Sequence, residues 1–392
     1  MSRYVGSTEA ARMLGVQKAT LYAYVSRGLI ARRVAVDGRT SLYSADDLDA
    51  LASRVRRREI EPRPSLDVQI VTGITVLDED GVRYRGHDVA ELARTADFEQ
   101  VAELLWTGAL PDAVTWPEPQ PADVARARRI AAAVGGRPGI AAMLATSSAL
   151  GVHHPDDEPA AAARRLLGVV PTVLGEIGDG TGSRGLGARL AAVWRPGVEA
   201  DADGSQFTLA VGRALVLLAD HELATSTLAV RVAGSTWAGP YPSIAAGLAT
   251  VQGSLHGGAA RLVHDLLVES ESVGAAAAIA RRQHAGERLP GYGHKIYKGD
   301  DPRLAPLLEV VASLPDPAGR REVVSDLLAE TGARFTRRPN VDLGLGALTF
   351  VGDLPPDVPL FAVARIAGFA AHLIEERQER PLRYRGLARP PR

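Results

Sequence analysis

The segment Pro290-Gly-Tyr-Gly-His-Lys-Ile-Tyr-Lys-Gly-Asp-Asp-Pro-Arg303 places a histidine beside a glycine and an arginine nine residues later. Two more segments accompany it, Gly253-Ser-Leu-His-Gly-Gly258 upstream and Asn340-Val-Asp342 downstream. Together they supply four candidate side chains: His256, His294, Arg303 and Asp342. Two imidazoles and a carboxylate suit the removal of a proton beside one carbonyl group and the polarisation of a second.

Length and composition restrict the class of protein. The chain has 392 residues and a formal net charge of -1, and at this length two or three domains are expected. It has no cysteine, which excludes disulfides and cysteine-ligated metals. The N-terminus lacks the apolar run of a secretory signal, and Arg, Asp or Gly interrupts each Ala-rich stretch. We therefore expect a cytoplasmic protein without a membrane span.

Residues 1–58 are expected to form a separate small domain. Ser7 is a helix N-cap candidate and Gly28 a stop for a second helix, which gives a helix-turn-helix. Asp37-Gly38 between two β-prone runs predicts a hairpin, and Ser44 is placed to cap a further helix. Prolines and mixed charge make residues 59–65 a linker.

This small domain resembles the winged helix-turn-helix of the MerR and excisionase families. The resemblance implies DNA as a partner, with phosphate and base-edge contacts from the second helix and the wing. The candidate DNA-binding residues are Lys18, Thr20, Tyr22 and Arg39. The alternative is a solvated basic face that packs or regulates without binding DNA.

Short strands and then mainly helices are expected from residue 66 onward. Predicted strands are Val68–Ile70, Thr75–Leu77 and Val82–Arg85, and residues 387–392 form a tail. Gly and Pro breaks separate the Ala-rich helices, which predicts closely packed helix pairs. The predicted helices are Val89–Ala93, Phe98–Thr107, Phe207–Val232, Ile244–Val251, Ala259–Val268 and Leu360–Glu375.

The stretch 66–386 resembles citrate synthase in the three segments quoted above and in four others. These are Val71–Asp88, Phe98–Pro111, Asp220–Thr236 and Ala364–Glu375 with Arg380-Pro381. The resemblance implies an all-α homodimer in which a large and a small domain close over the site. It also implies an acyltransferase of the tricarboxylic acid cycle that condenses acetyl-CoA with oxaloacetate, giving citrate and CoA. Coenzyme A thioester is then a substrate, and neither a cofactor nor a metal is expected.

The resemblance assigns a role to each motif residue. Asp342 is the expected base, His256 the donor to the thioester oxygen and His294 the donor to the oxaloacetate ketone. Considered alone, a lone histidine is more often structural, and Asp342 fits a turn or a helix cap equally well. The wider motifs favour catalysis at these three positions. The other histidines, His221 excepted, are expected to be structural.

The substrate-binding residues follow from the same resemblance. Two carboxylates of oxaloacetate need bidentate partners, which arginine provides better than lysine. The expected ligands are His221, Arg303 and Arg365 of one subunit and Arg380 of its neighbour, for which Arg383 is a local competitor. Coenzyme A is expected to contact the loop residues Leu289, Pro290, Gly291, Tyr292 and Gly293, and Lys298.

Three departures from the family pattern leave alternatives open. Ala224, Ala260 and the run Leu343-Gly344-Leu345 replace residues that are polar or aromatic in many members. One alternative is a 2-methylcitrate synthase that uses propionyl-CoA. The helix-turn-helix domain opens the other alternative, a DNA-binding transcription regulator with a citrate synthase-like domain that senses a metabolite.

Overall fold

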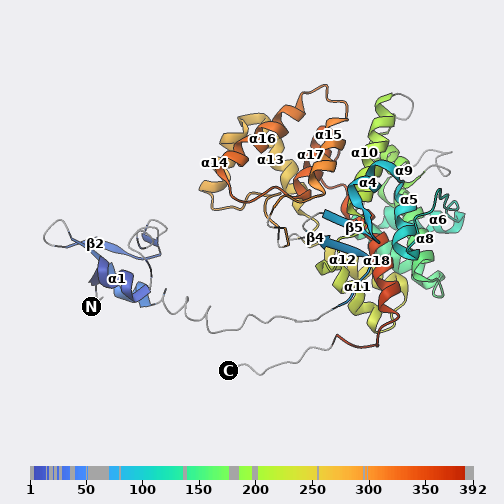
Figure 1. Cartoon of the computed structure of the whole chain (residues 1–392), viewed down its shortest axis with the longest axis horizontal. Helices are drawn as coiled ribbons and strands as arrows, with labels where there is room; N and C mark the ends of the chain where they lie inside the picture. The colour runs from blue at the N-terminus through green and yellow to red at the C-terminus, as the bar shows by residue number, and fades with distance from the viewer. Residues whose placement is uncertain are drawn as a thin grey trace. The chain divides into compact units, whose positions relative to one another are not determined.

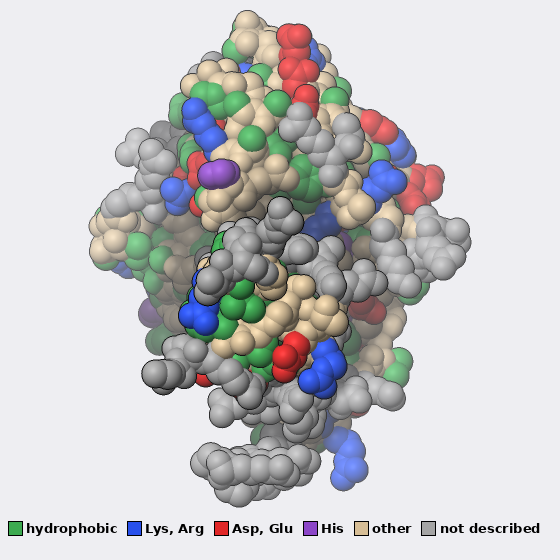
Figure 2. Space-filling model, turned by 90° about the vertical axis from the view of Figure 1, so that its left-hand side faces the viewer, with side chains coloured by type: hydrophobic (Ala, Val, Ile, Leu, Met, Phe, Trp, Pro, Cys, Tyr) green, Lys and Arg blue, Asp and Glu red, His purple; other side chains and the backbone are tan. Residues whose placement is uncertain are grey.

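A computed structural model gives the fold of two compact units, Met1–Gln69 and Ile70–Arg392. It describes residues 4–14, 16, 21, 24–25, 29–35, 40–49, 51, 70–78, 81–135, 139–175, 185–196, 202–253, 256–294, 296–297 and 299–384. Within these ranges, no helix has the length and apolar character needed to cross a membrane. Side chains of both charge signs are interspersed on the face drawn in Figure 2.

The first unit contains a small antiparallel sheet and helix α1. Strand β1 (Tyr4–Gly6) leads into helix α1 (Ser7–Leu14), and β2 (Arg32–Val34) and β3 (Ser41–Ser44) follow. The strand order is β1-β3-β2. Pairing of β2 with β3 confirms the predicted hairpin, although its Asp37-Gly38 turn lies outside the described residues. The buried core of this unit comprises Val5, Ala10, Leu21, Ile30, Tyr43, Ala45 and Leu48.

A second three-stranded sheet opens the larger unit. Strands β4 (Thr75–Asp78), β5 (Gly81–Tyr84) and β6 (His87–Asp88) pair antiparallel in chain order. This confirms the strands predicted around the turn at residues 78–81, whereas most of Val68–Ile70 lies outside the described residues. Tyr84 is fully buried, and its hydroxyl donates to the carbonyl oxygen of Asp220 at 2.8 Å. The sheet is thereby attached to the chain segment that carries His221.

The helices of the larger unit form two groups (Figure 1). The large lobe contains α18 (Leu360–Glu376), which packs against α5, α8, α10, α11 and α12 and is buried along most of its length. Its other helices are α4 (Val89–Thr95), α5 (Phe98–Thr107), α6 (Pro121–Val134), α7 (Ile140–His153), α8 (Pro159–Leu174), α9 (Leu186–Trp194), α10 (Ala202–Leu218), α11 (Thr225–Ser235) and α12 (Pro240–Val251).

The small lobe consists of five helices that follow in the chain. They are α13 (Ala259–Val273), α14 (Ala275–His284), α15 (Leu304–Ala312), α16 (Arg320–Arg334) and α17 (Val341–Val351). Helix α17 packs against α13 and α15 and is buried at almost every position. A Cβ at Gly346 would lie 2.5 Å from Val263 of α13, so this helix pair approaches too closely for any larger residue. A Cβ at Gly344, within the Leu343-Gly344-Leu345 departure, would lie 2.7 Å from Leu307 of α15, so this departure also serves packing within the small lobe.

The predicted helix Phe207–Val232 is wrong, because the chain breaks between α10 and α11. Asp220 turns its side chain to accept hydrogen bonds from Thr75 at 2.5 Å and from the Glu222 amide at 3.1 Å. Glu222 has a φ of 53°, which a continuous right-handed helix does not allow. The break turns the short segment 219–224 toward the β-sheet and α18. His221 lies in this segment and is buried.

Candidate active site

The loop that carries His294 joins α14 to α15 and is fixed to the chain preceding Asp342. Gly291 and Gly293 have φ values of 78° and 88°, which favour glycine. The Gly293 amide donates to the Arg338 carbonyl at 2.8 Å, and the Asn340 amide donates to the Gly291 carbonyl at 2.9 Å. Asn340 also donates its side-chain amide to the Gly293 carbonyl at 2.8 Å. Two of the three motif segments are therefore one hydrogen-bonded assembly.

His294 has a defined tautomer within this loop. Its Nδ1 accepts hydrogen bonds from the backbone amides of Ile296 at 3.1 Å and Tyr297 at 3.3 Å. Burial, with a further effect from the positive charge of Arg303, lowers the pKa of His294. The ring is therefore neutral at pH 7 with its proton on Nε2, which remains a hydrogen-bond donor.

Asp342 lies in the first turn of α17. Its amide donates to the side chain of Asn340, the N-cap residue, at 3.0 Å. Burial raises the pKa of Asp342 to about 6, while Arg303 and Arg365 act in the opposite direction. The Asn-x-Asp turn of the structural alternative is therefore present in the backbone, with Asn340 rather than the Asp342 carboxyl group as the helix cap.

His256 lies between α12 and α13, at the junction of the two lobes. Its Nε2 is 2.8 Å from the hydroxyl oxygen of Ser226 in α11. The imidazole lies edge-on to Phe361, with ring centroids 5.6 Å apart. Burial lowers the pKa of His256, and the charge of Arg365 lowers it further. This histidine is also neutral at pH 7.

Arg303 is held by a buried carboxylate. Two of its guanidinium nitrogens donate to Asp301, from Nε at 3.0 Å and from Nη2 at 2.8 Å. Asp301 also accepts from the backbone amide of Val341 at 3.1 Å. Burial opposes the charge of Arg303, but Asp301 raises its pKa above the ordinary value. The arginine is thus positioned against the first turn of α17, next to Asp342.

Arg365 of α18 is the one buried arginine in this region with unsatisfied donors. It is 1% exposed, yet its Nε and Nη1 have no hydrogen-bond partner among the described residues. The nearest carboxylate oxygen, Oδ1 of Asp220, is 3.9 Å from Nη1 and also lacks a partner among the residues described. Burial lowers the pKa of Arg365 to about 10, which leaves it charged at pH 7. A buried guanidinium with two N–H groups that lack a hydrogen-bond acceptor is a strong binding position for an anion.

His221 connects this arginine to the His294 loop. Its ring lies edge-on to that of His294, with centroids 5.3 Å apart, and its Nε2 is 3.0 Å from the Tyr297 hydroxyl oxygen. Burial lowers the pKa of His221 well below its usual range, and both Arg303 and Arg365 lower it further. Charges from both lobes therefore act on the pKa values of five predicted residues, which are His221, His294, Arg303, Asp342 and Arg365. Arg365 also lowers the pKa of His256.

The remaining predicted residues have different positions. Leu289, Pro290 and Tyr292 lie in the same loop as Gly291 and Gly293, as expected. Arg380 is exposed beyond α18 and forms no ion pair with another residue that the structure describes. Arg383 instead pairs with Glu376 at 2.6 Å. Lys298 and the four candidate DNA-binding residues, Lys18, Thr20, Tyr22 and Arg39, lie outside the described residues.

Several site residues were missed by sequence reasoning. Ser226, Asp301 and Tyr297 contact the motif side chains directly, and Asn340 joins two motif segments. Asp301 and Tyr297 lie inside the quoted 290–303 segment, so its density of polar residues was a usable signal. Ser226 carries no such signal, because only the fold brings α11 under His256.

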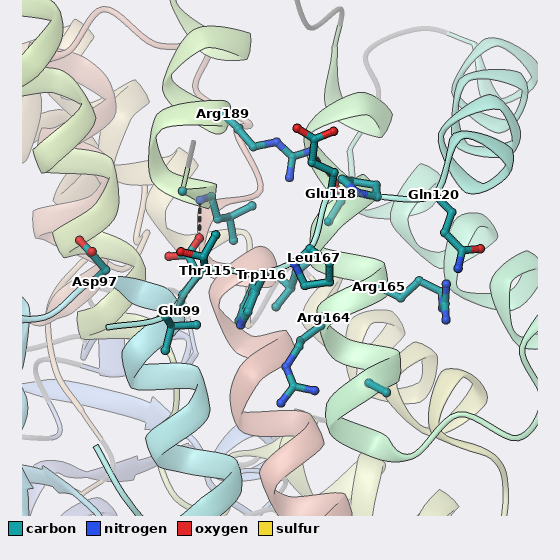
Figure 3. Close-up of a pocket in the computed structure, with 17 residues that line it drawn as sticks. Asp97, Glu99, Thr115, Trp116, Glu118, Gln120, Arg164, Arg165, Leu167 and Arg189 are labelled. Atoms are coloured by element: carbon teal, nitrogen blue, oxygen red, sulfur yellow. Dashed lines mark hydrogen bonds between the residues drawn. The ribbon is translucent and has the colours of Figure 1, made fainter. Parts of the chain in front are cut away.

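A separate cavity of about 460 Å³ lies in the large lobe. Figure 3 shows Trp116 in its wall with Arg164, Arg165 and Arg189 around it. Trp116 stacks on Trp106, with ring centroids 5.7 Å apart. None of the three motif segments contributes to this cavity, so it is not the site assembled by His294 and Asp342.

Comparisons with known proteins identify both units. Residues 67–390 match the family described as citrate synthase, C-terminal domain, and residues 4–56 match a helix-turn-helix domain family. The chain is 28% identical to the 2-methylcitrate synthase of Mycobacterium tuberculosis, over 76% of this chain and 81% of the relative. It is 30% identical to the citrate synthase of Synechocystis sp., over 76% and 82%.

Solved structures agree with these sequence relatives. The citrate synthase of Pyrobaculum aerophilum aligns with a TM-score of 0.67 and 25% identity, covering 82% of this chain and 90% of that one. The citrate synthase of Thermotoga maritima aligns with a TM-score of 0.64 and 25% identity, covering 85% and 95%. The fold expectation of a mainly α citrate synthase-like unit after a small helix-turn-helix domain is thereby confirmed. The chain belongs to the citrate synthase family and is an enzyme of that type.

Proposed function

We propose that this chain condenses an acyl-CoA with oxaloacetate, with acetyl-CoA as the substrate and citrate and CoA as products. The observation that carries the proposal is the placement of Asp342 in the first turn of α17, which Asn340 joins to the His294 loop and which Asp301, the partner of Arg303, also contacts, together with a pKa of Asp342 that is raised to about 6. A base with a pKa near the working pH removes protons efficiently. Neutral imidazoles can polarise carbonyl oxygens by donating N–H groups.

The first step forms the nucleophile. Asp342 takes a proton from the methyl carbon of the thioester, the C–H electron pair becomes the C=C bond, and the C=O π pair moves onto the thioester oxygen, which becomes an enol when it takes the proton that His256 donates. With Ser226 donating to Nε2, neutral His256 carries its proton on Nδ1 and donates it in a hydrogen bond to the thioester oxygen. That contact offsets the weak acidity of the α-proton.

The second step joins the two substrates. The enol carbon attacks the ketone carbon of oxaloacetate, and the ketone π pair moves onto its oxygen, which His294 stabilises through Nε2–H. Water then attacks the thioester carbonyl, the C–S bond breaks, and CoA leaves as the thiol with a new carboxylate on the product.

Oxaloacetate is held by the two buried arginines. The Nε and Nη1 of Arg365 lie on different edges of the guanidinium, and each offers one N–H group to oxaloacetate, which satisfies donors that otherwise remain buried without a partner. Arg303 and His221 complete the binding positions from opposite lobes. We assign the second carboxylate to Arg380 of another copy in a homodimer, because this residue is exposed and free of ion pairs to other described residues.

Coenzyme A binds along the loop Leu289–Gly293, with Lys298 as a phosphate contact. The left-handed glycines Gly291 and Gly293 keep this backbone free of side chains. Arg337 lies next to the loop, with its Cδ 3.5 Å from where a Gly293 Cβ would be, and it is a second cation for the phosphates. The reaction requires no further cofactor and fits a cytoplasmic enzyme of the tricarboxylic acid cycle.

Propionyl-CoA is the alternative acyl donor, because the relatives include proteins named 2-methylcitrate synthase as well as citrate synthase. The test is release of CoA thiol from each acyl-CoA in the presence of oxaloacetate, with the product identified by mass spectrometry. We expect citrate from acetyl-CoA at the higher kcat/KM. No thiol release from either donor contradicts the catalytic proposal, and a preference for propionyl-CoA replaces citrate by 2-methylcitrate.

A second function, DNA binding, is favoured by the match of residues 4–56 to a helix-turn-helix family. We assign residues 1–58 to this domain, 59–65 to the linker, 66–386 to the catalytic domain and 387–392 to the tail. In the predicted wing, β2 is exposed at all three positions and includes Arg32 and Arg33. Contacts from such arginines to phosphate make affinity fall steeply with salt.

The DNA-binding proposal has its own test. Fluorescence anisotropy with the DNA upstream of the coding region should show binding at low salt that Arg39→Ala or Lys18→Ala weakens. Thiol release by the same variants should be unchanged. If no salt-sensitive binding occurs, the domain is a packing or regulatory appendage, and the regulator alternative fails with it.

A further inference from the structure

We propose that Tyr297 is a positioning residue that fixes the imidazoles of His221 and His294 relative to each other across the two lobes. This proposal rests on the proposed function. Tyr297 precedes α15 in the small lobe, whereas His221 follows α10 in the large lobe. Its hydroxyl oxygen is 3.0 Å from Nε2 of His221, so one hydrogen bond spans both lobes. A hydroxyl donates and accepts, and it matches His221 in either neutral tautomer.

The same tyrosine orients His294 by two independent contacts. Its ring stacks on the imidazole with centroids 4.5 Å apart and planes inclined by 27°. Its backbone amide donates to Nδ1 of His294 at 3.3 Å. The stack fixes the plane of the imidazole, and the amide bond keeps the proton on Nε2, where the ketone oxygen of oxaloacetate needs it.

These three contacts of Tyr297 explain how His221 and His294, which come from different elements, are held in one arrangement. His294 and His221 lie at right angles with centroids 5.3 Å apart, and they share no hydrogen bond in the structure. Tyr297 contacts both rings, and its ring centroid lies 4.5 Å from that of His294 and 5.7 Å from that of His221. Because catalytic hydrogen bonds tolerate only small displacements, a residue that ties both imidazoles together controls the rate.

Two variants separate the two kinds of contact. Tyr297→Phe keeps the stacked ring and removes the hydroxyl, so oxaloacetate should bind ~2- to 10-fold more weakly by calorimetry, the cost of one hydrogen bond. The KM for oxaloacetate should rise by the same factor while kcat stays within about twofold. Tyr297→Leu also removes the stack, and kcat should fall ~10-fold or more, a loss in the range of one misplaced acid–base group.

Tyr241→Phe is the matched control. It also removes a tyrosine hydroxyl that bonds a side chain, Asp157 at 2.6 Å, but it does so in the large lobe away from both imidazoles. We expect it to leave kcat and KM unchanged. Long-range nitrogen-15 spectra of labelled histidine should show His294 protonated at Nε2 in the wild type and in Tyr297→Phe, and a tautomer mixture in Tyr297→Leu.

Three results would overturn the proposal. Tyr297→Phe could bind oxaloacetate as tightly as the wild type, which would mean that the hydroxyl has no part in binding. It could also bind more tightly, which would mean that the hydroxyl competes with the substrate. Tyr297→Leu could keep the wild-type kcat and tautomer. Both variants could lose folded protein and all kinetic parameters in parallel, as a purely structural residue does. A wild type that binds oxaloacetate but releases no thiol would refute the proposed function alone, because the calorimetric comparison still measures the His221 contact.

Discussion

The raised pKa of Asp342 has opposite consequences for activity and for stability. The folded state holds the proton of this carboxyl group more tightly than the unfolded chain does, with a pKa of about 6 against 3.8. The protonated carboxyl group therefore makes its full contribution to the free energy of unfolding below pH 4, and this contribution is lost as the pH rises through 6. Above pH 6 the buried carboxylate is present as the base that the reaction needs, at a cost to folding.

Asp342→Asn should therefore be inactive and more stable than the wild type at neutral pH. The difference in free energy of unfolding between the two proteins should grow by ~1–3 kcal/mol from pH 4 to pH 7, since only the wild type deprotonates a buried group there. Urea denaturation at several pH values measures it. A difference that is constant with pH would mean that Asp342 has an ordinary pKa.

Ser226 is expected to set the tautomer of His256 through the 2.8 Å contact between them. Ser226→Ala removes the hydroxyl with little change in volume, and kcat should fall ~10-fold while the KM for oxaloacetate is unchanged. Steady-state thiol release measures both. Equal loss in the two parameters would assign Ser226 to substrate binding or folding instead.

At the scale of elements, close helix packing in the small lobe depends on single glycines. Gly346→Ala introduces a Cβ at 2.5 Å from Val263 and 2.9 Å from the carbonyl oxygen of Ala260. We expect a loss of ~1–3 kcal/mol in the free energy of unfolding, the cost of overpacking. Gly332→Ala, at an exposed position of α16 with no neighbour within 4 Å of the added Cβ, should instead gain ~0.5–1 kcal/mol.

Thermal or urea unfolding of the two glycine variants measures this contrast directly. Equal effects of both substitutions would show that helix propensity, rather than the contact between α13 and α17, decides stability in this lobe.

Several elements could be predicted from the sequence, and the failures have physical causes. Period-2 and period-3.6 patterns predicted β4, β5 and the helices α4, α5, α12, α13 and α18 with bounds near those observed. The helix over 207–232 was wrong because local propensity does not register the buried hydrogen bond from Thr75 to Asp220, which is made 145 residues apart in the chain. Helices α6 to α9 are Ala-rich and lack site motifs, so nothing singled them out.

The same distinction applies to the candidate site. Residues that carry chemistry within a local motif, such as His294 and Arg303, could be identified from the sequence. Residues that act by tertiary contact, such as Ser226, could not, because no local pattern records which helix lies beneath a histidine. The orientation of each imidazole also depends on hydrogen bonds that only the folded chain forms.

At the scale of the whole molecule, the proposed active site requires two copies of the chain. Arg380 is exposed and lacks an ion pair to other described residues, and we expect it to complete the site of a second subunit. Mixing inactive His294→Ala with inactive Arg380→Ala under conditions of subunit exchange should restore about a quarter of wild-type activity, since half of the dimers then hold one intact site. An active monomer by light scattering would contradict the shared site.

The most direct test of the central claim is oxaloacetate-dependent release of CoA thiol from acetyl-CoA by the full-length chain, measured from pH 5 to pH 8. We predict that kcat/KM rises with pH and levels off above an apparent pKa near 6, as Asp342 loses its proton, and that Asp342→Asn abolishes the reaction at every pH. Thiol release that does not depend on oxaloacetate, or that persists in Asp342→Asn with the same pH profile, would contradict the account.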